Sequence, residues 1–210
     1  MTTELLALTQ WLSPSFPLGA FAYSHGLETA VATGAVADVR SLERWVADLL
    51  LRGSAQLDAT ILLYVLRGGD PVDAAAIAEA LATSAERWQE SRDMGAAFAG
   101  TLSEMTGTPR DAFPFPVALG LAARSLSMVP ETVAMLFLQS FAANQVGCAQ
   151  RAMALGQGAA QAVLHRLSPV IADAATVAAR SDLDRMGACA VGADIAAAAH
   201  ESLQPRAFRT

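Results

Sequence analysis

One stretch of the chain comes near to a catalytic motif: Ala22-Tyr23-Ser24-His25-Gly26. It resembles the Gly-x-Ser-x-Gly nucleophile elbow, with alanine in place of the first glycine. In that elbow a strand leads into a strained turn, which exposes the serine hydroxyl above a sheet. His165 or His200, with an aspartate such as Asp173, could complete a triad with Ser24. Prolines and glycines occupy the place of the required strand, so a small serine hydrolase is kept only as the alternative interpretation.

Metal and nucleotide motifs begin at two places and fail at a defined position in each. His200-Glu201 starts like the zinc motif His-Glu-x-x-His, but Gln204 stands where the second histidine belongs. Gly156-Gln157-Gly158 starts like a dinucleotide fingerprint, but Gln161 replaces the third glycine. The histidines and cysteines show no metal-ligand spacing. We therefore predict no metal site, no cofactor and no catalytic residue, and metal binding through His25 or Cys148 at a dimer interface stays the open alternative.

The basic residues exclude a large class of enzymes. Lysine and arginine together number 14, and every one of them is arginine. A P-loop needs the lysine of Gly-x-x-x-x-Gly-Lys-Ser/Thr, and Schiff-base chemistry needs a lysine amine. The chain by itself therefore cannot be an ordinary P-loop nucleotide hydrolase.

Net charge and cysteine content indicate the setting of the protein. The formal net charge of −6 argues against nucleic-acid binding, which usually requires a basic face. Two cysteines, Cys148 and Cys189, form no Cys-x-x-Cys pair, and so few thiols suit a reducing cytosol. The first ten residues lack the basic region and apolar run of a secretory signal. We expect a cytoplasmic protein.

The composition is apolar for a protein that works as a monomer. Hydrophobic residues make up 53% of the chain and charged residues 16%. Such a surplus predicts apolar surface hidden in an oligomer or a complex. The uncharged window 132–150 contains Gln139, Ser140, Asn144 and Gln145, so it predicts a buried helix rather than a membrane span.

The hydrophobic pattern is helical nearly throughout. Leu42, Trp45, Val46, Leu49 and Leu50 have the i, i+3, i+4 spacing of a stripe that faces a core. No segment alternates with a period of two, so the 210 residues predict one all-α domain, a bundle of roughly eight to ten helices. The expected helices are 3–12, 24–33, 42–66 with a kink at Gly53–Ser54, 72–83, 84–106, 116–127 and 131–158, and Ser168-Pro169 opens another.

The N-terminal stretch 13–28 reads as a surface of fixed shape. Phe16, Phe21 and Tyr23 lie among prolines and glycines, which hold a loop at little entropic cost, while aromatic side chains supply anchor area. We predict an N-terminal contact segment over residues 1–23. The open alternative is that Phe16 and Phe21 fill the local core.

The C-terminal stretch 200–210 offers a second such surface. Arg206 and Arg209 bracket Phe208 after Pro205, which places forked donors around an apolar anchor. We predict a functional C-terminal tail over these residues. The alternative is a frayed end, as in most chains.

Several short motifs, taken in order, make the chain similar to one known family. Each motif alone is weak, but the set spans essentially the whole sequence and has a matching terminus. The chain resembles the urease accessory protein UreF family in Ser13-Pro14, Pro17-Leu18-Gly19, Phe21, Ser24-His25-Gly26-Leu27-Glu28, residues 115–121, Arg151 with Leu155-Gly156-Gln157, His200-Glu201 and Arg206-Ala207-Phe208-Arg209-Thr210.

The resemblance implies an all-α homodimer without an active site of its own. Proteins of this kind bridge a UreD/UreH-type scaffold protein and the P-loop GTPase UreG. The complex delivers nickel to the lysine-carbamate site of apo-urease, and regulation of the GTPase is a further implied role. A chain that cannot build a P-loop can still act on a partner that has one.

The resemblance also implies positions for partner contacts. The scaffold face falls on the N-terminal stretch and the tail, and the GTPase face falls near the Arg151 region. Ala154 stands where the family usually has proline, so the kink expected there is in doubt. Ser24 is then expected to be a turn or N-cap residue, and Glu28 to pair or hydrogen-bond. The implied partner-binding residues are Tyr23, His25, Glu28, Arg151, Gln157, Arg206, Phe208 and Arg209.

Overall fold

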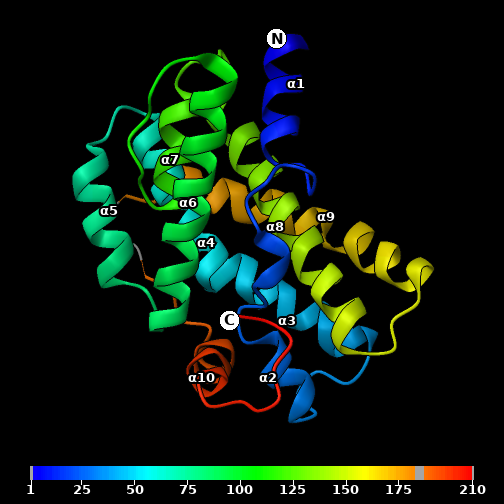
Figure 1. Cartoon of the computed structure of the whole chain (residues 1–210). Helices are drawn as coiled ribbons and strands as arrows, with labels where there is room; N and C mark the ends of the chain where they lie inside the picture. The colour runs from blue at the N-terminus through cyan, green and yellow to red at the C-terminus, as the bar shows by residue number, and fades with distance from the viewer. Residues whose placement is uncertain (1, 183–186, 210) are drawn as a thin grey trace.

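The computed structural model describes residues 2–182 and 187–209. Within these ranges the chain is helical and contains no strand (Figure 1), which confirms the predicted all-α class. The single-domain assignment and the homodimer stay predictions. The helices are α1 (Thr2–Trp11), the 3-10 helix η1 (Ala20–Ala22), α2 (Leu27–Ala32), α3 (Val39–Arg52), α4 (Ser54–Leu66), α5 (Pro71–Ala80), α6 (Ala85–Thr106), α7 (Phe115–Ala123), α8 (Pro130–Ala152), α9 (Gln157–Arg180) and α10 (Val191–His200).

The core forms around α4, which is buried on nearly every side. Helices α3, α7, α8 and α9 pack against it, and α8 also packs along α9. One helical stretch of the described residues, Val39–Leu66, is long and apolar enough to cross a membrane, but 72% of its most apolar window is buried inside the fold. Core helices meet the same criterion of length and composition, so the burial accounts for its hydropathy.

Local sequence signals set several helix ends. Asp38 and Ser41 form a capping box at the start of α3, in which the Ser41 N–H donates to Asp38 Oδ1 at 2.7 Å. Asp70 caps α5 by accepting from the Val72 N–H at 2.7 Å, with Pro71 at the first helical position. The kink predicted at Gly53–Ser54 is a break between two helices, since α3 ends at Arg52 and α4 begins at Ser54.

Several predicted helix boundaries are wrong. The helix expected over 24–33 begins only at Leu27, because Gly26 has a left-handed backbone (φ 77°) that an α-helix cannot include. The helix expected over 131–158 ends at Ala152, because the chain becomes extended at Met153, and α9 starts after Gly156. The connection between α8 and α9 thus forms with Ala154 at the position where the family usually has proline.

Pro169 does not open a helix as predicted. It lies inside α9, which runs without interruption from Gln157 to Arg180. Proline inside a helix removes one backbone hydrogen bond and crowds the preceding turn. Burial of Val163, Leu167 and Ile171 on one face of α9 offsets that cost.

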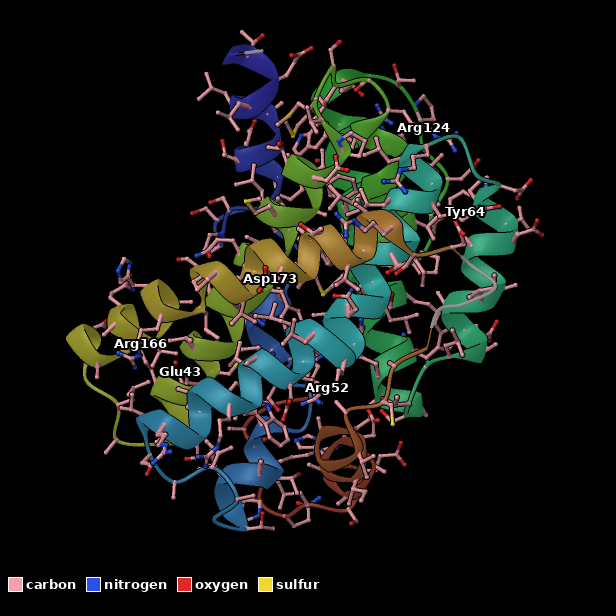
Figure 2. All side chains as sticks on the ribbon, turned by 180° about the vertical axis from the view of Figure 1, so that it is seen from behind. Glu43, Arg52, Tyr64, Arg124, Arg166 and Asp173 are labelled. Atoms are coloured by element: carbon pink, nitrogen blue, oxygen red, sulfur yellow. The ribbon has the colours of Figure 1, made fainter. Side chains whose placement is uncertain are left out.

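The C-terminal tail meets the segment that precedes α2 on one side of the molecule. In Figure 1, α2 and α10 lie side by side at the bottom, and the tail after α10 returns toward the N-terminal segment. The Arg209 N–H donates to the Ala22 carbonyl at 2.7 Å, which joins the tail to the segment before α2. Figure 2, turned by 180° from Figure 1, shows α3 and α9 in front, which the ion pair of Arg166 Nε and Glu43 Oε2 links at 2.7 Å.

Candidate partner-binding site

The N-terminal segment is a compact series of turns between α1 and α2. The Phe16 N–H donates to the Ser13 carbonyl at 2.9 Å, and Gly19 takes a left-handed backbone that leads into η1. Phe16 is buried against Phe98, with ring centroids 5.7 Å apart, so it fills the core. Phe21 is 66% exposed and is therefore not a core residue. The two aromatic side chains thus have different roles.

Ser24 has none of the geometry of a nucleophile elbow. The segment before it is η1 rather than a strand, and the side chain of Ser24 is completely buried. Its hydroxyl accepts from the Glu28 N–H at 3.3 Å, which is the role of a turn residue. His165 and Asp173 are exposed on α9, where Figure 2 labels Asp173. The predicted turn role is confirmed, although the N-cap itself is Gly26.

Glu28 is the residue that holds the C-terminal tail. Its Oε1 accepts from the Ala207 N–H at 2.7 Å, and its Oε2 accepts from the Phe208 N–H at 3.0 Å. His200 Nε2 lies 3.0 Å from the same Oε2 atom. Burial opposes the ionised form, but these hydrogen bonds from His200, Ala207 and Phe208 leave the pKa of Glu28 below its usual value. The carboxylate is thus charged when it binds the tail.

His200 connects three parts of the fold. It is the last residue of α10, and its imidazole has no exposed surface. While Nε2 faces Glu28 on α2, Nδ1 lies 2.8 Å from Glu86 Oε2 on α6. The other oxygen of Glu86 accepts from the Arg206 guanidinium of the tail. Helices α2, α6 and α10 therefore meet the tail at one cluster of charges.

Phe208 anchors the tail in the fold. Its side chain is only 6% exposed, and Arg151 Cζ of α8 lies 4.8 Å from the centre of its ring, a cation–π distance. The Arg151 guanidinium also donates to the Phe21 carbonyl at 2.5 Å and to Cys148 Sγ at 3.2 Å. Burial raises the pKa of the Cys148 thiol to about 11, with Arg151 opposing, so this cysteine is held as an unreactive thiol.

Tyr23 and Arg209 complete this junction. The Tyr23 hydroxyl donates to Asp93 Oδ2 of α6 at 3.3 Å. Burial raises the pKa of Tyr23, and the Arg209 side chain opposes that change by hydrogen bonding to the phenol oxygen. Asn144 of α8 donates to the carbonyls of Ala20 and Tyr23 at 3.0 and 3.3 Å. Side chains from two long helices thus fix the backbone of the N-terminal segment against the tail.

The sequence of this chain is similar to those of known proteins. The UreF family model matches residues 36–168. The chain is 48% identical over 210 residues to the urease accessory protein UreF of Cereibacter sphaeroides (strain KD131 / KCTC 12085), with 100% of both chains covered. The chain belongs to the UreF family. It is also 44% identical to the UreF of Dinoroseobacter shibae over 211 residues, with 100% of both covered, and 41% identical to that of Rhizobium etli over 217 residues, covering 98% of this chain and 96% of the relative.

A second charge cluster lies inside this UreF-family chain. His25, a non-glycine residue with a left-handed backbone (φ 52°), places its Nε2 2.9 Å from Glu90 Oε1 and its Nδ1 3.2 Å from Ser54 Oγ. Arg87 pairs with Asp58, and its Nη1 lies 3.7 Å from Glu90 Oε2. All five side chains are buried, so the cluster fixes α4, α6 and the N-terminal segment relative to one another.

A cavity of about 520 Å³ lies beneath the N-terminal segment. Its walls include Phe115, Phe137 and Phe141, and the buried cluster of His25 and Glu90 lines its polar part. Among the described residues, no group of three or more His, Cys, Asp and Glu side chains could hold a metal ion. The N-terminal segment thus forms one wall of the cavity, and aromatic side chains of the core form another.

The structure brings most of the sequence-predicted UreF-type residues together and leaves one apart. Gln157 is exposed at the first residue of α9 and belongs to none of the contacts described above. Three further residues, Glu86, Asp93 and Asn144, hold the segment and the tail in place and were not predicted from the sequence. No signal marked them, because each is a polar residue on a long helix whose pattern does not identify its partner. The residues brought together at the tail are Tyr23, Glu28, Arg151, Arg206, Phe208 and Arg209, and His25 belongs to the second charge cluster.

Proposed function

We propose that this chain is a non-catalytic accessory protein of urease maturation that works by binding other proteins. The observation that carries the proposal is the joining of the N-terminal segment and the tail, through Glu28, into one surface. Family membership supports the urease context, since the relatives are named urease accessory proteins. Nickel is then the cargo of the assembly rather than a cofactor of this chain.

The partners follow from the family likeness and the composition. The chain forms a homodimer and bridges a UreD/UreH-type scaffold and a UreG-type GTPase, and the complex acts on apo-urease in the cytoplasm. The scaffold contacts fall on the joined surface, where Phe21 is an exposed aromatic anchor beside Arg209. The GTPase face falls near Arg151 and Gln157, and binding there alters GTP hydrolysis.

Size-exclusion chromatography with light scattering tests the proposal. The chain alone is expected to elute as a dimer, and addition of its cognate scaffold and GTPase is expected to gather all three proteins into one peak. Phe21→Ala is the variant of choice, because its exposed side chain can be removed without opening the core. Val72→Ala, at an equally exposed site on α5, is the matched control.

The expected result is a loss of scaffold binding of at least about tenfold for Phe21→Ala, as for a truncated hot-spot residue, and none for Val72→Ala. A chain that elutes as a monomer and binds neither partner would overturn the proposal. Equal scaffold binding by Phe21→Ala and the wild type would contradict the assignment of the scaffold site to the joined surface.

A further inference from the structure

His200 can make both of its contacts well in only one protonation state. A neutral imidazole has one N–H and one lone pair, whereas an imidazolium donates from both nitrogens. In this structure Nδ1 and Nε2 each face a carboxylate oxygen, at 2.8 Å from Glu86 and 3.0 Å from Glu28. Ionised carboxylates only accept hydrogen bonds. The geometry is therefore that of a cationic histidine between two acceptors.

The same two carboxylates hold the tail. Glu28 accepts the N–H groups of Ala207 and Phe208, and Glu86 accepts the Arg206 guanidinium. If His200 loses either ring proton, one carboxylate faces a lone pair at about 3 Å and is repelled. Whichever carboxylate turns away gives up contacts that hold the tail. Both neutral tautomers thus weaken tail docking.

The charge balance of the cluster has the same consequence. Among the described residues, the charged groups that contact this cluster are Glu28 from α2, Glu86 from α6 and Arg206 from the tail. On α10 itself, Asp194 lies in the first turn, at the opposite end from His200. Two carboxylates are balanced by Arg206 and a cationic His200. A neutral His200 would leave one negative charge uncompensated in a site from which water is largely excluded.

We propose that His200, as an imidazolium, is the positioning residue for the C-terminal tail, and that the tail undocks as rising pH removes its second ring proton. The tail is then a latch whose closed state requires acid or neutral conditions. Undocking would free Phe208 from its site beside Arg151 and separate Arg209 from Ala22. Docking of the tail takes place within one chain and does not depend on the proposed function. Only the effect of undocking on partner binding rests on that function.

Nuclear magnetic resonance of the full chain labelled with ¹⁵N and ¹³C tests the latch. Spectra are recorded between about pH 5 and about pH 9, which spans the range in which histidine ordinarily changes charge and extends above it, because the two carboxylates favour the imidazolium. The amide resonances of Ala207 and Phe208 are expected to move toward those of an unstructured peptide as pH rises. Their midpoint is expected to coincide with that of the His200 ring carbons. Tail amides that keep their docked shifts over the whole range would overturn the proposal.

Variants separate the charge of His200 from its packing. The glutamine of His200→Gln supplies one donor and one acceptor but carries no charge. The ratio of docked to free tail is therefore expected to fall about tenfold, the effect of one lost buried hydrogen bond. The ratio should also no longer depend on pH. His165→Gln, at an exposed site on α9, is the matched control and should keep the wild-type response. A pH response of the tail that survives in His200→Gln would also overturn the proposal.

A second variant covers the case in which His200→Gln does not fold. Glu86→Gln keeps the shape of a partly exposed side chain but removes one of the two charges that favour the imidazolium. The tail of this variant is expected to undock at lower pH than that of the wild type, with helix content unchanged. An unchanged midpoint would count against the proposal. No partner protein enters these measurements, so their failure would leave the adaptor role standing, and failure of the adaptor role would leave the latch standing.

Discussion

The Phe208 N–H donates to the Glu28 carboxylate at 3.0 Å, across a sequence separation of 180 residues. This bond and its neighbour from Ala207 are made by the backbone of the tail, so they depend little on the tail's side chains. The contact therefore depends mainly on the acceptor, Glu28. This glutamate lies in the first turn of α2, where its negative charge also interacts favourably with the helix dipole. The N-terminal segment and the tail are thus parts of one structure that neither end could form alone.

Loss of the Glu28 charge is expected to destabilise the fold. Glu28→Gln keeps the side-chain shape but weakens bonds to two backbone donors and to His200, at a cost of about 1–3 kcal/mol. Urea unfolding near neutral pH, followed by circular dichroism, measures the change. Glu131→Gln, in the first turn of α8, is the comparison for a glutamate at a helix start.

The same variant carries a pH signature. Because the folded-state pKa of Glu28 is lowered, its charge stabilises the fold fully at pH values above the unfolded pKa of about 4.3. That contribution is lost as pH falls through the lower folded-state pKa. The stability difference between wild type and Glu28→Gln should therefore shrink in acid. A difference that grows in acid would contradict this account of Glu28.

Two glycines with the same backbone should respond differently to substitution. Gly26 and Gly19 both have a left-handed backbone, with φ of 77° and 72°. A Cβ at Gly26 would lie 2.6 Å from the backbone N of Ala197 on α10, whereas one at Gly19 would meet nothing within 4 Å. Gly19→Ala should cost about 1–2 kcal/mol, the penalty of a left-handed backbone.

Gly26→Ala should cost clearly more than that, because α2 and α10 must also move apart. Thermal unfolding of the two variants side by side makes the comparison. Equal losses of stability would show that the close approach of α2 to α10 does not matter.

Local patterns in the sequence were sufficient for much of the helical framework. Leu42, Val46, Leu49 and Leu50 are buried as their spacing predicted, and the break at Gly53 lies where the glycine indicated. The prediction that Pro169 opens a helix was wrong because proline is normally a local signal for a helix start. Its place inside α9 depends instead on packing along a 24-residue helix.

The candidate site could be located only in part from the sequence. Tyr23, Glu28 and Phe208 stood out through their motifs, but motifs do not reveal that Glu28 binds the tail backbone. Those contacts require α2 and α10 to be adjacent, which no local pattern encodes. The buried pair of Asp58 and Arg87 was missed because a charged residue on a helix is usually a solvated one.

The Asp58–Arg87 pair gives a further prediction. Arg87→Met leaves Asp58 and Glu90 without their common cation in a buried site, at an expected cost of about 3–5 kcal/mol. Burial raises the pKa of Asp58, and Arg87 opposes that change, so the cost should be largest near neutral pH and should shrink in acid as the unpaired Asp58 takes up a proton. Replacing both partners, as Asp58→Leu with Arg87→Met, should recover a large part of the loss.

The exposed pair of Arg166 and Glu43 is the matched control, since it also joins two helices (Figure 2). Arg166→Met should cost less than about 1 kcal/mol. Chemical denaturation of the single and double variants measures all four values. A double variant no more stable than Arg87→Met would contradict the view that the lost stability comes from unpaired charge.

The two cysteines should differ widely in reactivity. Cys148 is buried with its pKa raised to about 11, and its Sγ donates to the Tyr23 carbonyl at 3.3 Å. Cys189 is exposed and outside any helix. Since the thiolate is the reactive form, a thiol reagent at about pH 6, where the tail is expected to be docked, should modify Cys189 first and Cys148 only after unfolding. Mass spectrometry of the native and the denatured chain should show one label and then two. Cys189→Ser should abolish the fast reaction, and fast labelling of Cys148 in that variant would mean that the tail and the N-terminal segment open readily around it.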